Sequence, residues 1–178
     1  MIGGTISMKI SLLEALPLRN TISRRIQDLL SERHNVAFVQ FEKGEEYEKP
    51  ERTVEEVTKE LNEVRRDFRK LDILVYKANL EAKITWDDEE ICIAEAIELA
   101  KQLRGEAGNL KVFAQSKKQE RNYSYGSEVP SYEKALFDPS DMQKQVIKLE
   151  KMANRLSLTI EKANHVHTID FDAAEKYM

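Results

Sequence analysis

The sequence has very little cysteine: Cys92 is the single thiol in 178 residues. One thiol cannot form an internal disulfide, and a lone cysteine is typical of proteins in the reducing cytosol. We therefore expect a cytoplasmic protein in which Cys92 is a small apolar residue near a helix start. The chain also has only four prolines and six glycines. So few helix breakers favour long helices over a compact mixed sheet.

Long apolar runs are missing as well. No run approaches the roughly 20 residues that a membrane-spanning helix requires, so we expect no membrane association. Residues 1–7 lack the charged start and apolar centre of a secretory signal. Because Met8 could equally start the chain, we expect residues 1–7 to be a dispensable extension.

Neither sign of charge dominates. Twenty-eight basic and 32 acidic residues give a net charge of −4, and both signs are spread along the chain. Without a basic excess, the composition does not favour a nucleic-acid partner.

Two long stretches have apolar residues at strict steps of three and four, the spacing of a coiled-coil seam. The first comprises Val54, Val57, Leu61, Val64, Phe68, Leu71, Val75 and Ala78. The second comprises Met142, Val146, Leu149, Ala153, Leu156, Ile160 and Ala163. Both end in Lys-Ala-Asn. The spacing predicts an all-α fold, an antiparallel coiled-coil or helical bundle.

Four helix starts are indicated by a capping residue followed by an acidic partner or a proline. These are Ser11 with Glu14, Thr53 with Glu56, Asp87 with Glu90, and Asp138 before Pro139. Pro17 lies beyond the tolerant first turn of its helix and predicts a kink or a later start there. Gly105 and Gly108 each cost a helix about 1 kcal/mol, which predicts either close approach of another helix or a break.

Two long connectors separate the helices, at residues 35–52 and 117–138. Val36–Val39 is a short apolar run that resembles a strand. Of the twelve Phe and Tyr residues in the chain, seven lie in these connectors. We therefore expect short β-like connectors that are packed, as a small ribbon.

The chain also matches itself. At an offset of 85, identical residues recur as Leu71/Leu156, Lys77/Lys162, Ala78/Ala163, Asn79/Asn164 and Ile84/Ile169. At an offset of 81, the segment 14–18 resembles 95–99. Helical sequences share some residues by chance, but the matching order and lengths favour two pseudo-repeats. We place them at about 9–84 and 89–170, as two helical hairpins within one domain at 8–178.

Asn79 and Asn164 would then be equivalent. One hypothesis is that each closes its helix, because asparagine tolerates the left-handed conformation. The other is that they form a buried polar layer with Arg19 that fixes helix register. In either case we expect the Arg19 stem to pack and its head to find a carbonyl or carboxylate.

No pattern predicts a catalytic, cofactor-binding or metal-binding residue. His165 and His167 would point to one side of an extended segment and could form a metal pair. On a helix, residues two apart do not share a face, so a solvated helix end is the better interpretation. No cofactor is expected.

Several short motifs resemble a known family. In the first half they are Glu14-Ala15-Leu16 followed by Arg19, Val39-Gln40 leading to Gly44-Glu45, and Asn79. In the second half they are Arg121-Asn122-Tyr123-Ser124, Ser127-Glu128-Val129 and Asn164. From Met8 to about Asp172 the chain resembles the septicolysin-like family of small bacterial helical proteins of otherwise unknown function. The second-half arginine is missing near Ile97, and His165 replaces a tryptophan. The resemblance implies a helical, oligomeric protein, and its lysin label would imply pore formation.

The sequence therefore predicts a non-enzymatic self-assembling or protein-interaction module. A homo-oligomer is expected because rods with narrow seams leave other faces to cover, and an unknown protein partner is also compatible. One alternative is a membrane-acting, lysin-like protein, although no segment resembles a pore-forming helix. Another is a metal-dependent enzyme that uses the connectors and the His165/His167 end.

Overall fold

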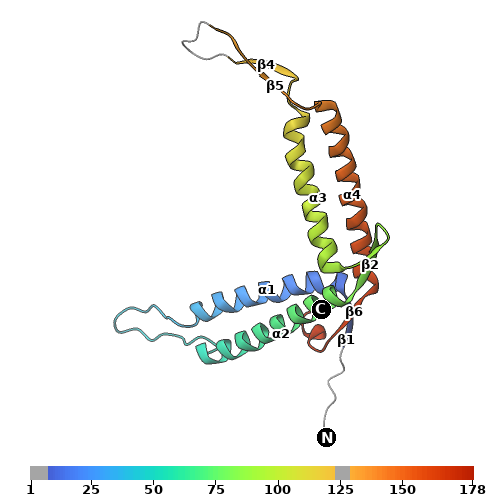
Figure 1. Cartoon of the computed structure of the whole chain (residues 1–178). Helices are drawn as coiled ribbons and strands as arrows, with labels where there is room; N and C mark the ends of the chain where they lie inside the picture. Colours follow the sequence, from blue (N-terminus) through green and yellow to red (C-terminus); the bar gives the residue numbers. More distant parts are fainter. Residues whose placement is uncertain (1–7, 123–128) are drawn as a thin grey trace. The chain divides into compact units, whose positions relative to one another are not determined.

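The computed structural model describes residues 8–122 and 129–178, and the predicted extension at 1–7 lies outside them. The described chain is mostly helical, with three small antiparallel strand pairs (Figure 1), so the all-α prediction is too narrow. In chain order the elements are β1 (Met8–Ser11), α1 (Leu12–Asn35), α2 (Val54–Glu81), β2 (Lys83–Trp86), β3 (Glu89–Cys92), α3 (Ile93–Ala114), β4 (Gln119–Asn122), β5 (Ser131–Lys134), α4 (Pro139–Val166), β6 (Thr168–Phe171) and the 3₁₀ turn η1 (Ala174–Lys176).

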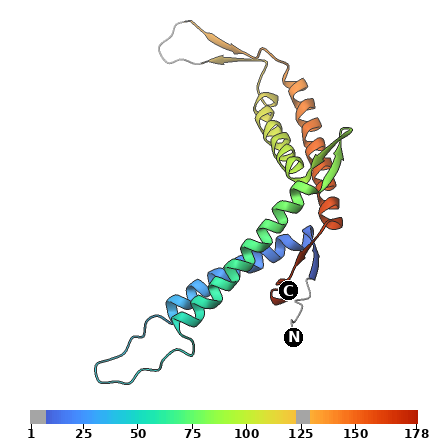
Figure 2. The ribbon, with the colours of Figure 1, turned by 60° about the horizontal axis from the view of Figure 1, so that its bottom comes forward.

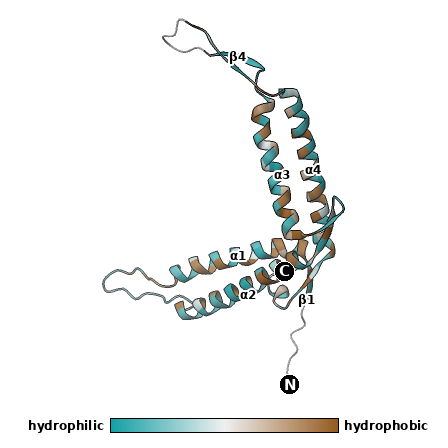
Figure 3. Cartoon of the chain, viewed as in Figure 1, coloured by the Kyte–Doolittle hydropathy of each residue, from teal (hydrophilic) through white to brown (hydrophobic). Residues whose placement is uncertain are grey.

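The elements form two compact units. Unit 1 comprises residues 1–82 and 164–178, and unit 2 comprises residues 83–163. In unit 1, α1 and α2 lie side by side along their length, and residues 36–53 join them at one end (Figure 2). Hydrophobic residues recur along all four helices (Figure 3). Among those in unit 1, the fully buried ones include Ile22, Leu29, Leu61 and Leu71.

Local capping sets three of the helix starts, as predicted. Glu14 N donates to Ser11 Oγ (3.2 Å) while the Glu14 carboxylate accepts from Ser11 N (2.8 Å). Thr53 and Glu56 form the same reciprocal pair before α2. Before α4, Ser140 N donates to Asp138 Oδ1 (2.8 Å). These bonds satisfy backbone donors that a helix leaves unpaired at its N-terminus.

The third predicted start is wrong. Asp87 does not cap a helix; with Asp88 it forms the two-residue loop between β2 and β3, in which Trp86 faces Glu89. Both aspartates have positive φ, 48° and 67°, as a tight hairpin turn requires. α3 instead starts after Cys92, whose Sγ accepts from Glu95 N (3.4 Å). Cys92 thus lies at a helix start, as expected.

Two strand pairs have the same register. In unit 1, Ile10 of β1 faces Ile169 of β6. In unit 2, Ile91 of β3 faces Ile84 of β2. All four isoleucines are buried. The two leading strands are 81 residues apart and the two trailing strands 85 apart, the same offsets at which the sequence matches itself.

Several helix details differ from expectation. α1 starts at Leu12 and continues through Pro17, so the later start is wrong. α3 is unbroken, and a Cβ at Gly105 or Gly108 would meet no atom within 4 Å, so neither predicted reason for these glycines holds. The strand-like run Val36–Val39 forms no strand.

The aromatic connectors differ from each other. In the first, Phe38, Phe41 and Tyr47 are exposed, so the predicted packing is wrong there. The second does contain a ribbon, β4 paired with β5, and Phe137 packs edge-on against Phe113 of α3 at 5.3 Å. The part of this connector at residues 123–128, with Tyr123 and Tyr125, lies outside the described residues.

Candidate interaction surfaces

A row of large apolar side chains on α2 is exposed. Ile73, Tyr76 and Leu80 are 65%, 61% and 61% exposed and are spaced by three and four residues, so they lie on one side of the helix. Leu16 of α1 is also exposed. We call these four residues the apolar face of unit 1.

An ion pair joins the two helices beneath this face. The Arg19 guanidinium donates two hydrogen bonds to the Asp72 carboxylate and lies over the Phe68 ring at 4.9 Å. Asp72 raises the pKa of Arg19 above its ordinary value. Arg19 follows Leu16 by three residues, and Tyr76 follows Asp72 by four. Because residues at these spacings share a helix face, the ion pair places Leu16 and Tyr76 on the same side of the hairpin.

Arg19 thus finds a carboxylate, as expected, but it has no polar layer with the asparagines. Asn79 and Asn164 lie inside α2 and α4, each two residues before the helix ends. Among the described residues only Asp87, Asp88 and Gly44 have positive φ, so neither asparagine closes its helix in the left-handed conformation. Asn164 Oδ1 is buried without a hydrogen-bond partner. Both hypotheses about the asparagines are therefore wrong.

Unit 2 presents a smaller version of the apolar face. Ile97 lies 81 residues after Leu16, and Leu158 lies 85 after Ile73; both are exposed. Ser157, 85 residues after Asp72, accepts a hydrogen bond from Arg104 Nη2. An arginine thus bridges the helix pair in each unit, although in unit 2 it comes from one helical turn further along α3.

A hollow of about 600 Å³ lies where β4 and β5 meet the helices of unit 2. Val112, Phe113, Leu136 and Phe137 form its apolar lining, and Leu136 is 95% exposed. The ribbon beside it is fixed by Ala135 N, which donates to Lys118 O (3.0 Å). This is a second place where large apolar groups face solvent.

The first connector is held at its base by charges. Arg52 Nη1 donates to Glu32 at 2.7 Å and Arg52 Nη2 to Glu60 at 2.6 Å. Arg25 donates to the other Glu60 oxygen at 2.5 Å. Arg25 and Arg52 lower the pKa of Glu60 below its ordinary value. Residues 38–51, beyond this base, are exposed throughout.

The described residues offer no cluster for chemistry. His165 lies at the end of α4, and His167 lies between α4 and β6, where its carbonyl accepts from Leu12 N (2.9 Å). No group of three His, Cys, Asp or Glu within 8–122 and 129–178 could hold a metal ion. No helix described in the chain is long and apolar enough to cross a bilayer.

The chain belongs to a family of unknown function, DUF6847, whose model matches residues 19–169. It is also similar to a crystal structure of a functionally unknown conserved protein from Corynebacterium diphtheriae, with a TM-score of 0.64 and 20% identity. That likeness covers 92% of this chain and 100% of the other, and at such low identity it shows the fold alone. No curated protein matches the chain. None of these findings supports the septicolysin-like label.

The sequence argument did not identify the apolar faces. It treated apolar residues at heptad spacing as the buried seam and gave no weight to the second row at Ile73, Tyr76 and Leu80. That row was a usable signal. An apolar stripe beside a complete seam gives a helix more apolar surface than one partner can cover.

Proposed function

We propose that the protein is a non-enzymatic assembly module that associates with copies of itself through exposed apolar helix faces. The observation that carries the proposal is the row Ile73, Tyr76 and Leu80, each more than 60% exposed. Contiguous exposed apolar side chains on a helix are typical of protein–protein contacts. The protein is further proposed to act in the cytosol, in keeping with its lone cysteine.

An internal repeat supports self-association rather than a dedicated partner. The equal strand registers, the caps at Ser11 and Cys92, and the exposed pairs Leu16/Ile73 and Ile97/Leu158 support two equivalent hairpins. A chain that presents the same apolar pair twice presents like surfaces to its own copies. Like surfaces are what a symmetric, self-complementary contact requires. The coiled-coil character of each hairpin is part of the proposal.

Charged substitutions on the apolar face test the proposal. We expect wild-type protein to sediment as an oligomer and the variant I73E/L80E to sediment as one chain. Both positions are exposed, so the new carboxylates stay solvated and the fold is retained, which circular dichroism checks. The control K59Q/N62E makes the same change in net charge at exposed sites elsewhere on α2 and should keep the wild-type mass. An I73E/L80E variant with the wild-type mass would contradict the proposal.

A further inference from the structure

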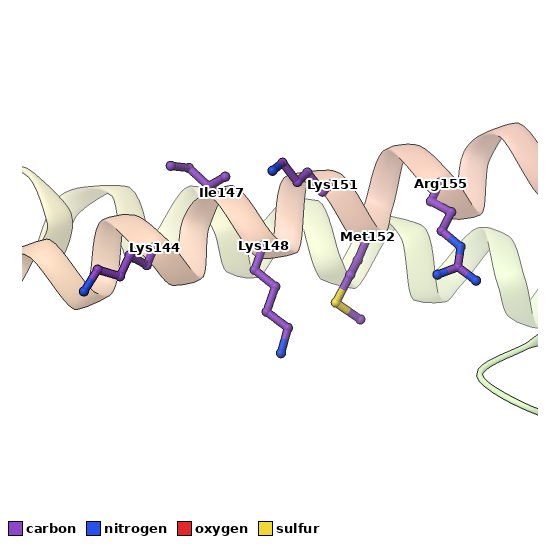
Figure 4. Close-up of a pocket in the computed structure, with 6 residues that line it drawn as sticks. All are labelled: Lys144, Ile147, Lys148, Lys151, Met152 and Arg155. Carbon is purple, nitrogen blue, oxygen red and sulfur yellow. The ribbon is translucent and has the colours of Figure 1, made fainter.

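One face of α4 is strongly cationic. Lys144, Lys148, Lys151 and Arg155 are spaced by four, three and four residues, and Lys162 follows seven residues later; all five are exposed. With 3.6 residues per turn, they lie on one side of the helix. We call these five residues the cationic stripe. Figure 4 shows four of them projecting from α4 together with Ile147 and Met152.

The stripe lies away from the core. On α4 the buried residues are Val146, Ala153 and Leu156, which fall on the opposite side of the helix. Ile147 and Leu158 are exposed beside the cations. The stripe residues Lys144 to Arg155, together with Ile147 and Met152, line one shallow surface groove.

Most of these charges are not neutralised within the described residues. Lys144 pairs with Asp141 at 2.8 Å, and Arg155 lies over the Trp86 ring at 5.2 Å. Lys148, Lys151 and Lys162 have no ion pair in the described part of the chain. The net charge of the whole chain is −4, so such a concentration of unpaired cations on one face needs an anionic partner.

The first connector has the complementary composition. Residues 42–51 contain five glutamates and two lysines, a net charge of −3, and every one of them is exposed. No glutamate among them forms an ion pair within the described residues. Phe41 and Tyr47 lie beside each other at 5.0 Å between ring centroids and are exposed. The segment thus offers carboxylates and aromatic rings together, while the stripe offers cations and apolar side chains.

We propose that the cationic stripe of one copy binds the acidic segment 42–51 of a second copy. Glutamates pair with Lys148 and Lys151, and the Phe41–Tyr47 pair covers Ile147 and Met152, a sulfur–aromatic contact of a favourable kind. The two surfaces differ, so the contact joins copies head to tail rather than symmetrically. This inference rests on the proposed self-association and names a second contact in it.

Charge reversal on each surface, followed by mixing, tests the contact. K148E/K151E and E45K/E46K each place like charges against each other when copies of the same variant meet. We expect each variant alone to associate about tenfold more weakly than wild type at low salt, because several exposed ion pairs each contribute modestly. When the two variants are mixed, each supplies the surface that the other needs. Analytical ultracentrifugation of the mixture should recover association to within about threefold of wild type.

Two controls make the outcome specific. Added salt should weaken wild-type association, because exposed charges are screened. Unchanged association of both charge variants, with I73E/L80E still monomeric, would overturn the inference and leave the proposed function standing. Failure of the mixture to recover would also overturn it. So would phosphatidylglycerol vesicles that bind wild type but not K148E/K151E without any change in self-association, since the stripe would then serve a lipid surface.

Discussion

At the residue scale, the stabilising charges are those that close the α1–α2 hairpin. Glu60 accepts hydrogen bonds from Arg25 of α1 and Arg52 of the connector, and it thereby joins three segments of unit 1. The residue is only partly exposed, so its ion pairs are less screened than those of the fully exposed connector glutamates. The position of Glu60, more than its charge alone, makes it important.

We predict that Glu60→Gln lowers the free energy of unfolding by about 1 kcal/mol at neutral pH, as expected for two partly exposed ion pairs. The folded-state pKa of Glu60 lies below its ordinary value of 4.5, so its contribution is complete above that pH. It is lost as pH falls through the lowered pKa. Urea unfolding from pH 7 to pH 3 should therefore show a difference between wild type and E60Q that shrinks in acid.

The matched control is Glu63→Gln, at an exposed carboxylate on the same helix without an ion pair in the described residues. It should leave the free energy of unfolding nearly unchanged at every pH. A deficit of E60Q that persists or grows in acid would contradict the assigned role of Glu60.

At the element scale, the sequence predicted what is local and missed what depends on pairing. The caps at Ser11, Thr53 and Asp138 could be predicted because a side chain and a backbone amide three residues away or fewer suffice. The β2–β3 hairpin could not, because Asp87-Asp88 is also a plausible helix start. Only the pairing of Ile84 with Ile91 decides between the two. β1 and β6 are separated by more than 150 residues, and no local pattern announces their pairing.

The candidate surfaces were predicted only in outline. The argument that narrow seams leave other faces to cover is supported by the exposure of Ile73 and Leu158. Which faces remain uncovered depends on how each hairpin packs, and that information is tertiary. The aromatic connectors were singled out correctly as unusual, but burial of the first one was wrong, because Phe38 and Phe41 find no core to join.

For α3 as an element, we predict that Gly105→Ala and Gly108→Ala each raise the free energy of unfolding by about 0.5–1 kcal/mol. Alanine loses less backbone entropy than glycine on forming a helix, and a methyl group at either site meets open space. Gly44→Ala is the contrasting control: its φ of 99° is strained for any side chain, so the same substitution should destabilise. Thermal or urea unfolding distinguishes these signs. Destabilisation by G105A would reveal a close contact on that face of α3.

At the scale of the whole molecule, the chain consists of two helical hairpins, each completed by a short strand pair, with charge and apolar surface left over on defined faces. The apolar face of unit 1 and the cationic stripe lie on separate helices. They can therefore act in separate contacts. A protein with two such contacts forms larger assemblies than a dimer, because one contact is symmetric and the other joins copies head to tail.

The mass of the wild-type protein in solution tests this account most directly. Light scattering coupled to size-exclusion chromatography, repeated from low to high micromolar concentration, measures it without any substitution. The account predicts a mass above the 20.6 kDa of one chain that rises with concentration. A mass that stays at one chain over the whole range would contradict the central claim that this protein assembles with itself.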